Sequence, residues 1–149
     1  MLLLLALLLA LSLPRAVFTM ALVALPMIAA YPWMKRITWW PQVFLGITFN
    51  LSALFGWLAT GAPLSLVPFL LYGAAIVWTL GYDTIYAVQD MADDARVGIR
   101  STALRVGVFL RPFVGICYST MLLLLLMAGM AMGSGPAFYL ALTAASVHA

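Results

Sequence analysis

The sequence has 149 residues, of which 66% are hydrophobic and only 7% are charged. A soluble globular domain carries about 25% charged residues, so this composition excludes a protein whose surface lies mainly in water. The formal net charge is +3, and we expect the lipid bilayer, not nucleic acid, to be its principal partner.

The apolar residues come in blocks that suit membrane-spanning helices. At 1.5 Å rise per residue, roughly 17 to 25 helical residues cross a bilayer core of about 30 Å. We therefore predict an all-α, polytopic transmembrane helix bundle that forms a single domain. In chain order, the expected spans are 1–13, 16–34, 41–60, 66–90, 104–132 and 136–149, of which the first and last are short.

The first block could also be read as a signal peptide, because a short Leu/Ala run precedes Pro14. It has no basic residue in front of the apolar run, and further spans follow, so a truncated span is the favoured interpretation. Cys117 is the only cysteine, which excludes an internal disulfide and leaves a thiolate metal site without a second cysteine.

The basic residues are distributed unequally between the two faces of the predicted bundle. Only Arg15 falls on one face, and by the positive-inside rule the opposite face is cytoplasmic, or lies in the matrix if the membrane is mitochondrial. We expect a multi-pass integral membrane protein whose basic face lies on that side. The residues on that face are Lys35, Arg36, Arg96, Arg100, Arg105 and Arg111.

All four acidic residues are aspartates within one twelve-residue stretch, Asp83, Asp90, Asp93 and Asp94. On one continuous helix, Asp83, Tyr86, Asp90 and Asp94 would lie within about 80° of one another, with Asp93 to the side. Asp90 and Asp94 would be one turn apart and could converge on a single ion.

Carboxylates at the end of a transmembrane helix are costly to desolvate, so they normally face water, pair with cations or bind a metal. Oxygen ligands favour Mg²⁺ or Ca²⁺, and Mg²⁺ prefers one or two carboxylates completed by substrate phosphates and water. Arg96 and Arg100 follow the cluster and could neutralise a bound diphosphate. The alternative is an interfacial loop in which Asp and Arg pair with one another, which suits Asp93 but not Asp83.

Three segments of this sequence resemble the UbiA-type intramembrane aromatic prenyltransferases. The strings YDTIYAVQD (82–90), DD (93–94) and GIRSTA (98–103) are similar to the second aspartate-rich motif of that family, YxxxDxxxD, placed on Tyr86, Asp90 and Asp94. The string YPWMKR (31–36), with Thr38, Pro41 and Gln42, is similar to its basic loop. The following helix matches at Gly46, Asn50, Gly56 and Trp57. The resemblance covers about residues 30–107 and is strongest to the branch that prenylates 4-hydroxybenzoate.

The resemblance implies a barrel-like helical bundle in a bacterial or mitochondrial inner membrane, with an active site in a central cavity that opens toward the cytoplasmic or matrix side. There Mg²⁺ holds a polyprenyl diphosphate, and the ring of 4-hydroxybenzoate is prenylated ortho to its hydroxyl for ubiquinone biosynthesis. It implies that Asp90 and Asp94 are metal ligands and that Arg100, with Arg96, holds the diphosphate. Lys35 and Arg36 would assist or bind the ring carboxylate, and the cavity would be lined by Asp83, Tyr86 and Asn50. For Tyr86 and Asn50, an ordinary interhelical hydrogen bond is an equal alternative.

The sequence also departs from the family pattern. Its first aspartate motif, NDxxDxxxD, is absent, and Ser52 stands where glycine is expected. We therefore expect a chain that is incomplete at its N-terminus and its C-terminus, holds at most half of the metal site and is inactive by itself.

Other functions remain open at this point. The protein could be a prenyltransferase of the same superfamily that acts on another quinone head group, on haem or on a chlorophyll precursor. It could also be a cation-coupled transporter, which predicts polar residues near span midpoints, where only Thr48, Asn50 and Asp83 come close. A non-catalytic membrane remnant is a third alternative.

Overall fold

The computed structural model describes residues 2–148 and contains only helices in that range. Met1 and Ala149, the outermost residues of the expected spans 1–13 and 136–149, lie outside the described residues. The helices are α1 (Leu2–Ser12), α2 (Arg15–Ile37), α3 (Pro41–Phe49), α4 (Leu51–Ala59), α5 (Leu66–Ala87), α6 (Met91–Val97), α7 (Thr102–Val106), the 3₁₀ turn η1 (Gly107–Phe109), α8 (Leu110–Met132) and α9 (Pro136–His148).

Four helical segments are long and apolar enough to cross a membrane. They are Arg15–Ile37, Pro41–Ala59, Leu66–Ala87 and Thr102–Met132, with the shorter apolar helix Pro136–Val147 following. Their outward-facing side chains include many large hydrophobic residues, such as Leu22, Phe69 and Ile116, which are at least half exposed. A bilayer, not water, suits such a surface, and the chain is an all-α, polytopic integral membrane protein.

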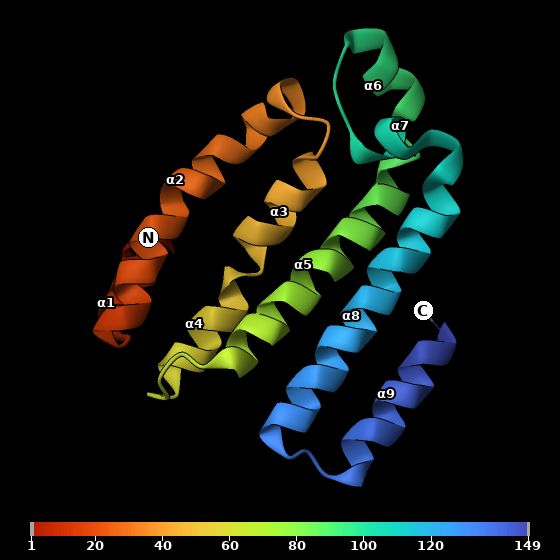
Figure 1. The fold of residues 1–149 in the computed structure, drawn as a ribbon. Helices are drawn as coiled ribbons and strands as arrows, with labels where there is room; N and C mark the ends of the chain where they lie inside the picture. The colour runs from red at the N-terminus through yellow and green to blue at the C-terminus, as the bar shows by residue number, and fades with distance from the viewer. Residues whose placement is uncertain (1, 149) are drawn as a thin grey trace.

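The helices lie in a row (Figure 1). In that row α5 packs along α8 and against α3, while α2 packs on α3 and α4, and α9 packs on α8. The short helices α6 and α7 sit together at the end of the row where α5 ends and α8 begins (Figure 1). This end also holds the connection from α2 to α3, and we call it the polar end, residues 35–42 and 83–105.

The α3–α5 contact depends on a small residue and a polar one. A Cβ atom on Gly46 would lie 2.9 Å from the carbonyl oxygen of Ile76, so only glycine allows the two backbones to approach this closely. One turn later the amide nitrogen of Asn50 lies 2.8 Å from Thr79 Oγ1 and 3.2 Å from the carbonyl oxygen of Ala75. These contacts fasten the middle of α3–α4 to α5.

Two expected spans are interrupted in the structure. The range 41–60 is divided at Asn50, whose side chain binds the carbonyl oxygen of Gly46 at 2.8 Å. The range 104–132 changes to a 3₁₀ turn at Gly107–Phe109 before α8 begins. Conversely, α2 continues one turn beyond residue 34, so Lys35 and Arg36 belong to its last turn and not to the connection that follows.

Candidate functional site

A polar pocket of about 190 Å³ lies at the polar end, between α2, the start of α3 and the end of α5. Its lining includes both signs of charge, which is unusual for a membrane-spanning bundle because charged groups there are costly to desolvate. The lining residues are Tyr31, Lys35, Gln42, Asp83, Tyr86, Ala87, Gln89 and Asp90.

The acidic stretch does not form one continuous helix. α5 ends at Ala87, the chain turns through Val88–Asp90, and α6 begins at Met91 with Asp90 as its N-cap residue. The expected stripe from Asp83 to Asp94 on a single helical face is therefore wrong, because the helix breaks where the chain leaves the apolar region. The turn instead brings the Asp90 side chain over the end of α5, so Asp83 and Asp90 line the same pocket.

Asp94 occupies a different environment from Asp90, although the two residues share a turn. The Asp94 amide donates to the Asp90 carbonyl at 2.8 Å. Asp90 is exposed, whereas Asp94 is only 7% exposed, and its Oδ2 atom is enclosed without a hydrogen-bond partner among the described residues. Such an atom is costly to bury, so it marks a place where a cation or a donor from outside these residues fits.

The C-terminal end of α6 fixes where Asp94 sits. Gly98 ends α6 in the left-handed conformation (φ 72°), and the amides of Gly98 and Ile99 both donate to the Asp94 carbonyl. This is the usual arrangement for a helix that ends in glycine. The backbone of Asp94 is therefore fully used, while its carboxylate is not.

The two neighbouring cations at the end of α2, Lys35 and Arg36, lie in different surroundings. Lys35 is partly buried and lines the pocket with Asp83, whereas Arg36 is exposed and lies outside it. Within the described residues, Lys35 makes no ion pair within 4 Å, since the one such pair joins Arg96 and Asp93. Of these two basic residues, only Lys35 can meet a ligand in this pocket.

Arg100 is held by the protein itself. Its amide donates to the carbonyl of Lys35 at 2.9 Å, its guanidinium donates to the carbonyl of Ile37 at 2.7 Å, and the guanidinium lies 5.6 Å from the centre of the Trp39 ring. A cation in this position satisfies carbonyls at the C-terminal end of α2. It joins the 98–102 loop to the α2–α3 connection and does not line the pocket.

Arg96 forms the expected pair with Asp93, at 3.4 Å, with side chains that are 78% and 82% exposed. The interpretation of Asp93 as a partner of arginine agrees with this contact. Neither residue lines the polar pocket.

Asn50 also lies away from the polar pocket, in the α3–α5 contact described above. Its amide group is occupied by Gly46, Ala75 and Thr79, which is the interhelical alternative given for it from the sequence. Tyr86, by contrast, is 64% exposed and lines the pocket.

The sequence assigns no site role to three polar residues of the pocket, Tyr31, Gln42 and Gln89. Gln42 is the most constrained of them, with 2% exposure. Its signal was a glutamine immediately after Pro41 at the start of an apolar span, where a polar side chain needs a specific partner. That partner, Thr102, is 60 residues away in sequence. A local sequence pattern therefore does not reveal the contact between Gln42 and Thr102.

Apolar hollows lie farther along the helices. One of about 320 Å³ is lined by α5 and α8 residues, including Trp78 and Met121. From Trp78 a row of aromatic rings runs along α5 to the polar pocket, with centroid distances of 5.0 Å from Trp78 to Tyr82 and 6.3 Å from Tyr82 to Tyr86. The row joins an apolar surface to a charged one.

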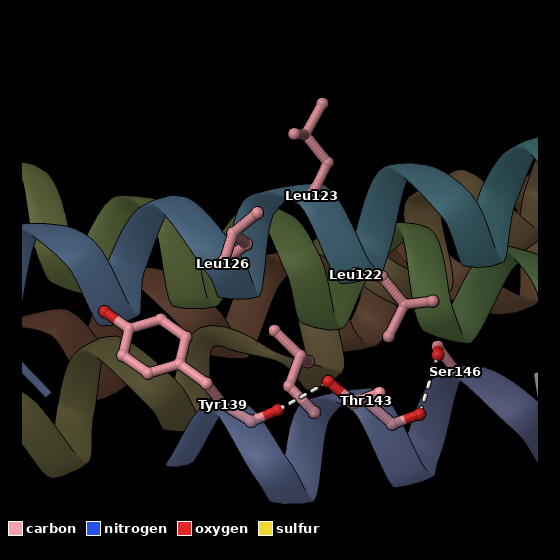
Figure 2. A pocket seen from close by; sticks show the side chains of 7 residues that line it. Leu122, Leu123, Leu126, Tyr139, Thr143 and Ser146 are labelled. Atoms are coloured by element: carbon pink, nitrogen blue, oxygen red, sulfur yellow. Dashed lines mark hydrogen bonds between the residues drawn. The ribbon is translucent and has the colours of Figure 1, made fainter. Parts of the chain in front are cut away.

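A further pocket of about 270 Å³ lies between α8 and α9. Figure 2 shows that Leu122 and Leu126 line its α8 side, while Thr143 and Ser146 turn back on their own helix. Their hydroxyls donate to the carbonyls of Tyr139 and Thr143 at 2.8 and 2.7 Å. This pocket therefore has no charged group and is not a candidate site for the chemistry of the polar end.

The polar pocket can bind a small molecule that carries an anionic group and a hydroxyl. Lys35 offers an ammonium group, Gln42 an amide, and Asp83 and Asp90 offer carboxylates that can accept a proton or face a cation. Within residues 2–148 no group of three or more His, Cys, Asp or Glu side chains is placed to hold a metal ion.

The sequence matches one known protein family over its whole length. Residues 1–149 match the UbiA prenyltransferase family, and the protein belongs to that family. The 4-hydroxybenzoate polyprenyltransferase, mitochondrial, of Homo sapiens is 44% identical over 126 residues, which are 84% of this chain and 34% of the human protein.

Other relatives carry related names. The 4-hydroxybenzoate polyprenyltransferase, mitochondrial, of Caenorhabditis elegans is 54% identical over 85 residues, 56% of this chain and 24% of the relative. The 4-hydroxybenzoate geranyltransferase 2 of Lithospermum erythrorhizon is 52% identical over 89 residues, 59% of this chain and 29% of the relative. The matched part of this chain thus spans a quarter to a third of the length of these relatives. No solved structure matches it.

Proposed function

We propose that this chain, within its complete protein, transfers a polyprenyl group from polyprenyl diphosphate to the ring of 4-hydroxybenzoate, ortho to the hydroxyl, in ubiquinone biosynthesis. One observation of the structure carries the proposal. A single pocket at the polar end is lined by Lys35 together with Asp83 and Asp90. The names of the relatives support the same substrates.

The pocket suits each part of the aromatic substrate. The Lys35 ammonium can hold the ring carboxylate through a charge-assisted hydrogen bond. Asp83 is partly buried on α5, and its carboxylate is suited to accept the proton that the ring releases. The row of aromatic rings from Tyr86 to Trp78 offers the prenyl chain a path toward the apolar hollow between α5 and α8.

The reaction balances with these groups. The bond between the prenyl carbon and the diphosphate oxygen breaks, and the diphosphate leaves with the electron pair. The ring carbon ortho to the hydroxyl forms the new C–C bond to the prenyl carbon, and its proton passes to Asp83. The row of aromatic rings from Tyr86 to Trp78 would shield the allylic cation from water.

Asp90 and Asp94 fit Mg²⁺ as the cofactor. Carboxylate oxygens are ligands that Mg²⁺ prefers together with substrate phosphates, and the enclosed Oδ2 atom of Asp94 has no partner among the described residues. When bound, Mg²⁺ would neutralise the charge of the diphosphate as it leaves. The remaining ligands would come from phosphate, water or other residues of the complete protein.

The basic residues support a cytoplasmic or matrix position for the pocket in an inner membrane. Lys35 and Arg36 end α2 at the polar end, and Arg96, Arg100 and Arg105 lie on or beside α6 and α7 at the same end. Arg15 begins α2 at the opposite end. By the positive-inside rule the polar end then faces the cytoplasm or the matrix.

The test is prenyl transfer in membranes from cells that express the complete reading frame carrying residues 1–149. We expect radiolabelled 4-hydroxybenzoate to become lipid-soluble only when polyprenyl diphosphate and Mg²⁺ are both present, and chelation to abolish the product. A competing head group, such as a naphthoate, should not reduce the yield. Transfer to that competitor in preference to 4-hydroxybenzoate would assign the protein to another branch of the family.

A further inference from the structure

The side chain of Gln42 is enclosed at the start of α3, next to the pocket that Lys35 and Asp83 line. It is 2% exposed, and a glutamine is rarely buried this far without a specific set of hydrogen bonds. The orientation of its amide decides what it offers to a ligand.

Thr102 fixes that orientation. The Gln42 Oε1 atom lies 3.1 Å from the backbone nitrogen of Thr102 and 2.7 Å from Thr102 Oγ1. A backbone N–H can only donate, so the amide atom that faces it has to be the oxygen. The NH₂ half of the amide, which can only donate, is directed elsewhere.

The NH₂ half is open to the pocket. Gln42 Nε2 makes no hydrogen bond among the described residues, and the one fully enclosed side-chain polar atom without a partner in that range is Asp94 Oδ2. Gln42 Nε2 is therefore in contact with accessible space. For a residue that is 2% exposed and lines the polar pocket, that space is the pocket.

The residues that hold the Gln42 side chain, Thr102 and its neighbour Ser101, are themselves buried and fixed in place. Ser101 and Thr102 are both 0% exposed, and the Ser101 side chain caps α7 by accepting from the Leu104 amide at 3.3 Å. A donor held this way loses little conformational freedom when it binds.

We propose that Gln42 is a substrate-binding residue whose amide N–H donates to an anionic oxygen of the substrate beside Lys35. This inference rests on the proposed prenyl transfer. The oxygen belongs to the carboxylate of the aromatic acid or to the diphosphate, and the experiment separates these two sources. The backbone N–H of Thr102 orients the Gln42 amide, whereas the Thr102 hydroxyl only adds a second hydrogen bond to the same oxygen.

Two substitutions of Gln42 separate its role as a donor to the substrate from its structural hydrogen bonds to Thr102. Gln42→Glu keeps an oxygen that accepts from Thr102 but replaces the NH₂ group with oxygen. Gln42→Met removes donor and acceptor at similar size and adds no charge. Thr102→Val is the matched control, because it removes the hydroxyl but keeps the backbone N–H that orients the amide.

The measurements are KM for each substrate in the complete reading frame and thermal unfolding in detergent. A hydrogen bond to a charged group corresponds to a rise of roughly 10- to 100-fold in KM when its donor is lost. We expect that rise in both Gln42 variants and for one substrate only. If the oxygen belongs to the aromatic carboxylate, KM for 4-hydroxybenzoate rises; if it belongs to the diphosphate, KM for polyprenyl diphosphate rises. We expect a lower unfolding temperature for Gln42→Met, and a KM within about threefold of the parent for Thr102→Val, whose backbone N–H still orients the amide.

Three results would overturn the proposal. An unchanged KM in Gln42→Met with reduced stability would show a purely structural residue, and a KM increase in Gln42→Glu alone would show charge repulsion. Equal Kd values of parent and Gln42→Met for 4-hydroxybenzoate and for inorganic diphosphate, measured by NMR on the same samples, would also overturn it. That binding comparison applies whether or not the parent turns over, so failure of prenyl transfer and failure of this inference are read separately.

Discussion

Two regions of the polar end use their polar groups in opposite ways. In the segment 98–102, Arg100 and Thr102 have partners at the end of α2 and the start of α3, at 2.7 Å for both the Arg100–Ile37 and the Thr102–Gln42 contact. Around the pocket, Lys35, Asp83 and Asp90 make no side-chain hydrogen bond to another described residue, and Asp94 Oδ2 is enclosed without a partner. Polar groups of similar sequence context thus divide into those that hold the fold together and those whose side chains remain available to a ligand.

The largest effect is expected when the proposed metal ligands, Asp90 and Asp94, are neutralised. Asp90→Asn or Asp94→Asn should lower prenyl transfer at least about 100-fold, because a neutral amide is a weaker ligand for Mg²⁺ than a carboxylate and the charge of the leaving diphosphate is then less well neutralised. Thermal unfolding should change little, and for Asp94→Asn it should move upward, since an unpartnered buried carboxylate is removed. Turnover and unfolding temperature are measured on the same membrane preparations.

Asp93→Asn is the matched control for this prediction. It changes the same charge one residue away, but its side chain is exposed and pairs with Arg96. Near-normal turnover in both Asp90→Asn and Asp94→Asn would show that these two aspartates, like Asp93, are not needed for the reaction.

A smaller effect is expected from the two cations at the end of α2. Lys35→Met should raise KM for 4-hydroxybenzoate about 10-fold or more, because the loss of a charge-assisted hydrogen bond corresponds to about 1.5–3 kcal/mol. Arg36→Met changes the adjacent cation, which is exposed and outside the pocket, and should leave KM within about twofold, as expected for a surface substitution. Initial rates at varied 4-hydroxybenzoate test both, and equal KM values for the two variants would contradict the assignment.

A substitution of Arg100 tests whether the 98–102 segment contributes to stability and not to turnover. Arg100→Met removes the hydrogen bond to Ile37 and the contact with Trp39, which should lower the free energy of unfolding by about 1–3 kcal/mol. Turnover per folded molecule should fall less than 10-fold if the arginine only holds the loop. Unfolding in graded SDS and a rate normalised to folded protein measure the two quantities.

Arg105→Met serves as the control for Arg100, because Arg105 is an exposed residue in the last turn of α7. A fall in turnover beyond 100-fold for Arg100→Met, without loss of stability, would instead support the diphosphate role that the sequence suggested for Arg100.

The fold class was predictable from the sequence because hydrophobic blocks of sufficient length leave few other structures in a bilayer. Helix breaks were less predictable. The end of α5 at Ala87 and the interruption at Asn50 depend on tertiary contacts, such as that between Asn50 and Thr79 at 2.8 Å. Hydropathy does not register contacts between residues 29 positions apart.

The candidate site was predictable in its acidic residues and not in its geometry. Four aspartates in an otherwise apolar chain mark a site by composition alone, and Asp83 and Asp90 do line one pocket. The separation of Asp90 from Asp94, and the use of Arg100 and Gln42, follow from how the 98–102 loop folds back on the α2–α3 connection. That contact joins residues 60 or more positions apart, beyond the range of any local pattern.

The smallest effect is expected from Arg96, which lies between the two regions in sequence. Its pair with Asp93 is long at 3.4 Å, and both side chains are more than three-quarters exposed. Exposed pairs of this kind contribute about 0.2–1 kcal/mol at most, and many contribute nothing measurable. Arg96→Ala should therefore leave unfolding and turnover at parental values, and its effect should not change between low and high salt. A KM increase for polyprenyl diphosphate that vanishes at high salt would show instead that Arg96 leaves Asp93 for the substrate, which would place it with the pocket residues and not with the loop.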